Sequence, residues 1–211
     1  MSAAKGFTLY GSWLSGPSYK VGLMLSLTGQ TFAYRALDLP KGAHKTPDYL
    51  AVNRYGQVPA LRHGDFTLVQ SNTILDYLSD LTGKYRGGNA ATTWHAKEWL
   101  AWEADRLAPG VYRSRFYNRF APNTDPAVIK VYRDAGEAGL KVLDGQLAKT
   151  KWLAGAEPTI ADIGCWCPVA YLEEAKFALG DFPHVKAWSE RLAALPGFKL
   201  PYDLMPKADV A

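Results

Sequence analysis

The residues best placed to do chemistry are hydroxyls at the start of a predicted helix. Ser15-Gly16-Pro17-Ser18 lies between a strand-like run, Phe7 to Tyr10, and a helical pattern that ends at Gly29. Proline in the first turn and glycine after the last are typical helix boundaries. A serine hydroxyl at a helix N-terminus can donate a hydrogen bond to an anion, and the helix dipole adds to the attraction. Ser15 is therefore the candidate catalytic residue, and three neighbours are alternatives for it: Tyr10, Ser12 and Ser18.

Two more motifs indicate a peptide-like ligand that carries a carboxylate. Gly56-Gln57-Val58-Pro59 enters a predicted strand, and in the thioredoxin-like domains that this turn resembles the proline is cis. Val58 would then turn its backbone N–H and C=O outward, toward an extended peptide. Ser71 follows Gln70 at a predicted helix start, where the free amides of the first turn form a natural seat for a carboxylate.

The elements that must position these motifs alternate between strand and helix. In chain order they are a strand over Phe7 to Tyr10, the helix after Ser15, a strand over Thr31 to Leu37, a short helix over Thr46 to Val52, a hairpin of Pro59 to Arg62 with Phe66 to Val69, and a helix over Ser71 to Leu81. This order predicts an α/β thioredoxin-like domain over residues 1–82. We expect residues 83–92 to be a linker and residues 93–211 to form an all-α helical bundle, with Pro109 kinking its first helix.

Over essentially its whole length the sequence resembles the cytosolic glutathione S-transferase family, in particular its serine-type classes (theta/nu-like). Ser15 takes the place of their catalytic serine. Lys41-Gly42-Ala43-His44-Lys45 is similar to the theta-class segment whose histidine contacts the glycyl carboxylate of glutathione. Gln57 stands where that class often has Lys or Gln, and Val58-Pro59 resembles the cis-proline pair. By the same resemblance Gln70 and Ser71 hold the γ-glutamyl group, although most serine-type classes have Glu or Asp before this serine.

The resemblance implies what the protein does and which partners it needs. It implies that glutathione is a co-substrate, that no metal is used, and that the thiolate attacks a small hydrophobic electrophile. It also implies a homodimer. The helical domain would contribute to the acceptor pocket, for which the candidate residues are Trp13, Leu14, Tyr112 and Phe116. Thr159-Ile160-Ala161-Asp162 resembles the family's capping box, which makes Asp162 a folding residue rather than a catalyst.

Composition excludes several other classes of function. A formal net charge of +4 without any basic run is too small for a nucleic-acid or membrane-surface binder. The start of the chain has no apolar segment of signal-peptide length, and no later stretch is long enough to span a membrane, so we expect a cytoplasmic protein. Cys165 and Cys167 are the only cysteines, and their spacing within an apolar helical pattern predicts two small buried side chains.

Each candidate residue also has a purely structural interpretation. Ser15 and the Gln70-Ser71 pair could be helix caps, Val58-Pro59 a structural turn, and His44 a solvated loop residue. Most aromatic residues of the helical half, from Trp94 to Tyr117, are expected in the core by their spacing. Two other functions remain open: a different glutathione-dependent reaction (lyase, isomerase or dehalogenase), and a binding module without catalysis.

Overall fold

The computed structural model describes residues 6–210, which divide into two compact units. Among these residues, the first unit combines 6–82 with 196–210, and the second spans Gly83–Leu195. The expected helical domain over residues 93–211 is therefore wrong at its C-terminal end, because the last part of the chain packs with the first unit.

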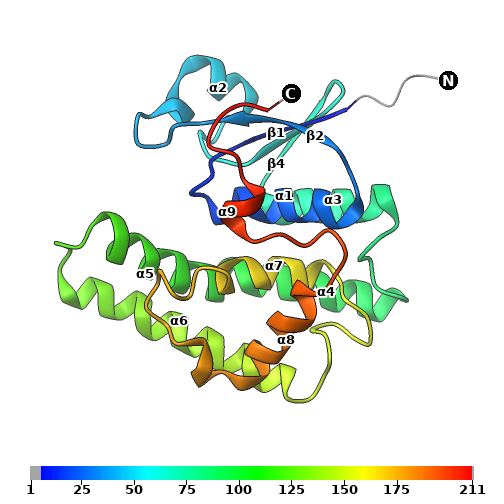
Figure 1. Ribbon diagram of the computed structural model, residues 1–211, viewed down its shortest axis with the longest axis vertical. Coiled ribbons are helices and arrows are strands. Elements are labelled where there is room, and N and C mark those ends of the chain that lie inside the picture. Colours follow the sequence, from blue (N-terminus) through cyan, green and yellow to red (C-terminus); the bar gives the residue numbers. More distant parts are fainter. Residues whose placement is uncertain (1–5, 211) are drawn as a thin grey trace. The chain divides into compact units, whose positions relative to one another are not determined.

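The first unit is a four-stranded sheet with helices on both faces. Its strand order is β2-β1-β3-β4, with β1 parallel to β2 and β3 antiparallel to both β1 and β4. Figure 1 shows α1 and α3 on one face of the sheet and α2 on the other. The elements are β1 (Phe7–Gly11), α1 (Gly16–Thr28), β2 (Phe32–Ala36), a 3-10 helix (Ala43–Lys45), α2 (Pro47–Val52), β3 (Ala60–His63), β4 (Phe66–Val69), α3 (Ser71–Thr82) and α9 (Pro201–Leu204). The predicted thioredoxin-like order is confirmed.

Helix α1 forms the core of this unit because most of its residues are buried and its buried side chains are mainly apolar. Val21, Leu23 and Leu25 are fully buried, and each contributes about 1.5 to 3 kcal/mol to folding. Ser15 caps the helix, Pro17 lies in its first turn, and Gly29 ends it in the left-handed conformation, with a φ of 74°. The predicted helix boundaries are confirmed.

The C-terminal segment belongs to the first unit because it binds along α1 and the sheet edge. The hydroxyls of Tyr19 and Ser26, both on α1, donate to the carbonyls of Lys199 at 2.9 Å and Gly197 at 2.5 Å. Val210 then exchanges two backbone hydrogen bonds, of 2.7 and 3.0 Å, with Tyr34 of β2. These partners are far apart in sequence, so the helical periodicity of the second half gave no sign of them.

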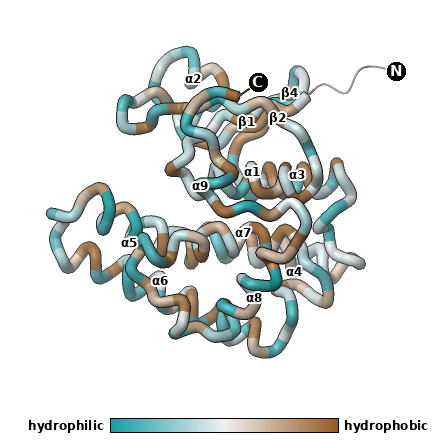
Figure 2. The backbone as a smooth tube through the Cα atoms, viewed as in Figure 1, coloured by the Kyte–Doolittle hydropathy of each residue, from teal (hydrophilic) through white to brown (hydrophobic). Residues whose placement is uncertain are grey.

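The regular elements of the second unit are helices. Its elements are α4 (Ala90–Trp102), a π-helix (Glu103–Leu107), α5 (Ala108–Phe120), α6 (Pro126–Leu147), α7 (Ile160–Val169), a 3-10 helix (Leu179–Asp181) and α8 (Pro183–Ala193). Helix α6 is amphipathic, and hydrophobic and hydrophilic residues alternate along it in Figure 2. Helices α5 and α6 cross so closely that a Cβ on Gly110 would lie 2.3 Å from the backbone nitrogen of Gly136. The predicted all-α architecture is confirmed.

Two details of this unit differ from the sequence-based expectations. The linker is shorter than residues 83–92, because Asn89 and Thr92 form a capping box that starts α4 at Ala90. The first long helix is interrupted before Pro109 rather than at it. Proline has no N–H, and its ring crowds the preceding helical turn. Just before Pro109 the chain forms the π-helix, in which the Ala108 N–H donates to the carbonyl of Glu103.

Two other predictions for the second unit concern buried residues. Thr159 and Asp162 form the expected reciprocal capping box at the start of α7. Cys165 and Cys167 are both buried in α7, as predicted for small side chains in an apolar helix. Within residues 6–210, no helix is both long and apolar enough to cross a membrane.

Candidate functional site

The sheet register brings the predicted site residues to one edge of the first unit. Tyr10 lies opposite Ala60, and Ala60 lies opposite Val69. Gly11 pairs with Ala36, so β2 ends at the same edge as β1. The loops at this edge carry the predicted residues: Ser15 after β1, His44 after β2, Gln57, Val58 and Pro59 before β3, and Gln70 and Ser71 after β4.

Ser15 is both a helix cap and a hydrogen-bond donor that the fold leaves available. Its Oγ accepts the N–H of Ser18 at 3.2 Å, which satisfies one free amide at the start of α1. A hydroxyl has one donor proton besides its acceptor lone pairs. Within residues 6–210 that proton is not donated to any protein atom, and the side chain is half-buried. The structural interpretation of Ser15 is therefore correct and compatible with the chemical one.

The three alternative hydroxyls are less well placed than Ser15. Ser18 is fully buried, and its Oγ accepts the N–H of Ser12 at 3.3 Å. Ser12 is only 2% exposed. Tyr10 packs against the ring of Tyr49 from α2 and beneath the guanidinium of Arg62, so it lies on the sheet face opposite α1. Ser15 is the hydroxyl that caps α1 and remains partly open to solvent.

The loop before β3 is fixed by α2 and presents an unused backbone edge. The Val58-Pro59 peptide bond is cis, as expected. The carbonyl of Gln57 accepts the Tyr49 hydroxyl at 2.7 Å and the Asn53 side-chain amide at 2.6 Å. In the described part of the chain, the backbone N–H and C=O of Val58 form no hydrogen bond. Burial raises the pKa of Tyr49 to about 12, so its hydroxyl remains a donor at neutral pH.

The start of α3 contains an unusual backbone conformation and a buried lysine. Gln70 has a φ of 72°, which is uncommon for a residue other than glycine, and its carbonyl accepts the N–H of Ile74 at 3.0 Å. The first-turn amides, beginning at Ser71, have no acceptor within the helix. Lys20, 2% exposed on α1, donates to the Asn72 side chain at 2.7 Å. Lys20 was not among the predicted residues, although it is the charged residue of an otherwise uncharged helix.

The segment after β2 contacts the loop before β3. The Lys45 ammonium donates to the carbonyl of Gly56 at 2.8 Å. Gly56 has a φ of 56°, and a Cβ there would lie 3.0 Å from the His44 carbonyl oxygen. The His44 Nδ1 is buried and has no hydrogen-bond partner in the part of the chain that the structure describes. Lys45 is a second residue that the sequence analysis did not single out, because its contact joins two separate loops.

The predicted acceptor residues come from both units. Trp13 and Leu14 lie in the turn before Ser15, and both are half-buried. Tyr112 and Phe116 are one turn apart on α5, but their environments differ. The hydroxyl of Tyr112 is buried without a hydrogen-bond partner in the described chain, and this burial raises its pKa. Phe116 is 44% exposed and lies against the rings of Tyr117 and Phe120.

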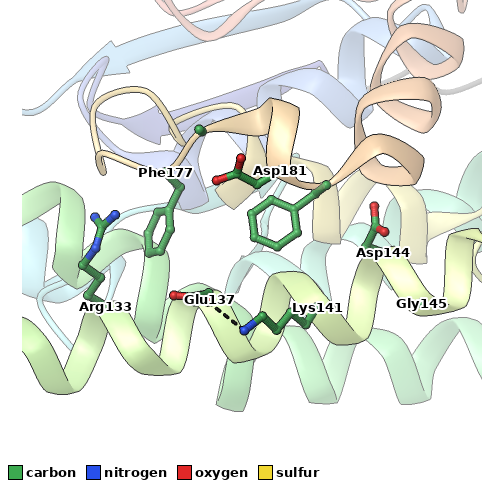
Figure 3. A pocket seen from close by; sticks show the side chains of 9 residues that line it. Arg133, Glu137, Lys141, Asp144, Gly145, Phe177 and Asp181 are labelled. Carbon is green, nitrogen blue, oxygen red and sulfur yellow. Dashed lines mark ion pairs between the residues drawn. The ribbon is translucent and has the colours of Figure 1, made fainter.

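A hollow in the second unit, of about 370 Å³, does not include these residues. It lies between α6 and the segment around Phe177 and Asp181 (Figure 3). Three of its charged residues, Glu137, Lys141 and Asp144, have structural partners. Lys141 pairs with Glu137 at 2.7 Å, and Asp144 accepts two backbone N–H groups at the start of α8, at 2.8 and 2.9 Å. These three charged residues therefore have structural roles.

Comparisons with known proteins agree with the two-part fold. The model of the glutathione S-transferase N-terminal domain matches residues 5–80, and that of the C-terminal domain matches residues 115–196. Glutathione S-transferase 3 of Zea mays is 35% identical over 205 residues, which cover 90% of each chain. The chain belongs to the glutathione S-transferase family. The class within the family stays a prediction.

Two other proteins similar to this glutathione S-transferase family member have names that mention a reaction or a bound ligand. The disulfide-bond oxidoreductase YfcG of Escherichia coli is 29% identical over 185 residues, 84% of this chain and 86% of that protein. A glutathione transferase of Phanerochaete chrysosporium, solved in complex with oxidized glutathione, superposes with a TM-score of 0.86 at 28% identity, covering 96% of this chain and 97% of that one. Residues 6–210 contain no group of three or more His, Cys, Asp or Glu side chains suited to holding a metal ion.

Proposed function

We propose that this protein is a glutathione transferase that activates the glutathione thiol with Ser15 and transfers it to a hydrophobic electrophile. One observation carries the proposal: Ser15 caps α1 through its oxygen, while its hydroxyl proton is not used by the described protein. A sulfur placed at this helix start would receive that proton as a hydrogen bond and would also lie at the positive end of the α1 dipole.

The available interactions are large enough for this role. A thiol with a pKa of about 8.5 is only a few per cent ionised at neutral pH. Lowering its pKa by about two units requires about 2.7 kcal/mol of preferential stabilisation of the anion. A hydrogen bond to a charged acceptor supplies roughly 1.5 to 3 kcal/mol, and a helix N-terminus adds about 0.3 to 1 kcal/mol. Ser15 and α1 together meet the requirement.

The rest of the tripeptide has matching partners along the same sheet edge. The open N–H and C=O of Val58 would pair with the cysteinyl residue in strand-like fashion. Ser71 and the first-turn amides of α3 would hold the γ-glutamyl carboxylate. Gln57 and His44 would hold the glycyl end, with the histidine acting through Nε2 because its Nδ1 is buried.

Calorimetry combined with thiolate absorbance tests the proposal. Glutathione at about one hundred times its Kd should raise the free energy of unfolding by about 2.7 kcal/mol. The ultraviolet absorbance of the bound ligand should show an ionised sulfur at neutral pH, and transfer to a chloronitroaromatic acceptor should be catalysed. Binding without ionisation or turnover would favour a binding module. The absence of both heat and thermal stabilisation would overturn the proposal.

Tyr49→Phe tests whether α2 positions the ligand-binding loop. The change removes one of the two donors to the Gln57 carbonyl, so the Kd for glutathione should rise by about twofold to fivefold. A tyrosine whose pKa is raised by folding stabilises the folded protein. This contribution is complete below the unfolded-state pKa and is lost as the pH rises through the folded-state pKa. Wild type should therefore lose stability between pH 10 and pH 12, and Tyr49→Phe should lose less.

Calorimetry and urea unfolding at alkaline pH provide the two measurements. Tyr55→Phe is the matched control, because the Tyr55 ring is 48% exposed and its hydroxyl contacts Arg54 instead of Gln57. An equal effect of the two substitutions on glutathione binding would refute the positioning role of Tyr49.

A disulfide reductase is the second candidate function, favoured by the likeness to the Escherichia coli oxidoreductase. Ser15 stands where a redox turn would carry cysteine, and both cysteines of the chain are buried in α7. Two glutathione molecules would therefore have to supply the electrons and leave as oxidised glutathione, while the substrate disulfide becomes two thiols. Assays with a small disulfide, with halides and with cis-trans isomerisable diacids on one preparation would separate these reactions.

Sedimentation would test the expected homodimer.

A further inference from the structure

A hollow beside the turn that leads to Ser15 is built by the C-terminal segment. It measures about 490 Å³ and is lined by Trp13, Tyr202, Asp203, Leu204, Met205, Pro206 and Lys207. All of these residues belong to the first unit. The sequence analysis placed Trp13 in an acceptor pocket but did not consider any residue of this C-terminal segment.

Trp13 of the hollow and Ser15 belong to the same turn. The N–H of Ser15 donates to the carbonyl of Ser12 at 2.9 Å, which closes a four-residue β-turn with Trp13 and Leu14 at its centre. Trp13, which lines the hollow, therefore lies two residues before Ser15 within one turn.

The C-terminal segment is fixed on both sides of the hollow. Before it, the Lys199 carbonyl accepts the Tyr19 hydroxyl at 2.9 Å. After it, the Asp209 carboxylate accepts the N–H of Ala36 at 2.8 Å, and Val210 pairs with Tyr34. Met205 is buried, and its sulfur would lie 2.8 Å from a Cβ added at Gly22 of α1. The hollow is therefore preformed rather than dependent on ligand-induced folding.

The walls of the hollow combine aromatic rings with a cation. The rings of Trp13 and Tyr202 meet edge to face with centroids 5.8 Å apart, and the Lys207 ammonium lies 4.7 Å from the Trp13 centroid. In the described chain, Lys207 forms no ion pair with a carboxylate. Asp203 also lines the hollow, and its carboxylate would repel an anion. The charged group that contacts the Trp13 ring is the Lys207 ammonium.

We propose that this hollow binds the acceptor and that Lys207 selects acceptors combining an electron-poor aromatic ring with an anionic group. The inference rests on the proposed transferase function. In the reaction, the glutathione sulfur forms a bond to the ring carbon that carries chlorine, the carbon–chlorine bond breaks, chloride leaves, and the thiol proton goes to solvent. The aromatic ring stacks on Trp13 and Tyr202, and the anionic group binds the ammonium.

A matched pair of acceptors measures this selectivity. 4-Chloro-3,5-dinitrobenzoate differs from 1-chloro-2,6-dinitrobenzene only by its carboxylate, and each kcat/KM is divided by the uncatalysed rate. The preference for the carboxylate should fall by about threefold to fivefold in Lys207→Ala and further in Lys207→Glu. It should rise in Asp203→Asn. Trp13→Ala should lower kcat/KM for both acceptors by about threefold to tenfold.

Lys199→Glu is the control, because it makes the same charge change in the same segment outside the hollow. The KM for glutathione should be unchanged in all Lys207 variants. An unchanged acceptor preference in Lys207→Glu, or an equal change in Lys199→Glu, would overturn the proposal.

A binding measurement separates this inference from the proposed function. Equilibrium dialysis with 3,5-dinitrobenzoate, which lacks the leaving group, does not depend on turnover. Tighter binding to wild type than to Lys207→Glu supports the hollow as an anion-selective aromatic site even if Ser15 proves inactive. Equal binding to both proteins refutes it even if transferase activity is present.

Discussion

Replacing Ser15 with alanine is expected to lower kcat for transfer by about tenfold to a thousandfold while glutathione still binds. The loss has a definite origin. The hydroxyl proton of Ser15 is the donor available to a sulfur at the start of α1, and without it the thiolate keeps only the helix dipole. The pKa of the bound thiol should therefore rise, and the pH profile of kcat/KM for the acceptor, measured at saturating glutathione, should shift to alkaline pH by the same amount.

Two further substitutions distinguish the loss of the Ser15 hydroxyl donor from the loss of the helix cap. Ser15→Ala also removes the acceptor for the Ser18 N–H, at a cost of about 1 kcal/mol in stability. Ser15→Asp keeps an acceptor for that N–H but has no hydroxyl proton and repels an anion, so it should be inactive without the same loss of stability. Ser15→Thr keeps both functions. Activity in Ser15→Asp similar to wild type, or an unchanged thiol pKa in Ser15→Ala, would contradict the mechanism.

Replacing Asp162 with alanine is expected to lower the free energy of unfolding by about 3 to 5 kcal/mol. Asp162 is fully buried and accepts the N–H groups of Leu153 at 3.0 Å, Thr159 at 2.8 Å and the Trp188 indole at 2.9 Å. Alanine would leave these donors buried without an acceptor. Asp162→Asn keeps one acceptor oxygen and should lose less.

Urea unfolding monitored by tryptophan fluorescence measures the effect, with Trp188 as a reporter beside the substitution. Asp144→Ala is the matched control, because Asp144 also accepts two backbone N–H groups, those of His184 and Val185, but is only half-buried. It should cost about 1 to 2 kcal/mol. If Asp162→Ala were no more destabilising than Asp144→Ala, the central role of Asp162 in folding would be excluded.

Much of the candidate site was predictable because its motifs are local. A serine before Gly-Pro, a Val-Pro turn before a strand and Gln-Ser at a helix start each determine backbone geometry within a few residues. The cap at Ser15, the cis bond at Val58-Pro59 and the helix start at Ser71 accordingly lie where the sequence placed them. The alternation of strands and helices then brings these ends to one sheet edge, since only a few topologies satisfy it.

The amino-acid sequence by itself determined the two architectures, the turns that carry the candidate residues and the capping box at Asp162, because these depend on hydrophobic periodicity and on neighbouring side chains. Only the tertiary structure decided that Lys45 binds Gly56, that Lys20 reaches Asn72, and that the last residues join the first unit. Each of these contacts joins residues separated in sequence, the last by most of the chain. Their formation depends on packing between surfaces, which no local pattern specifies.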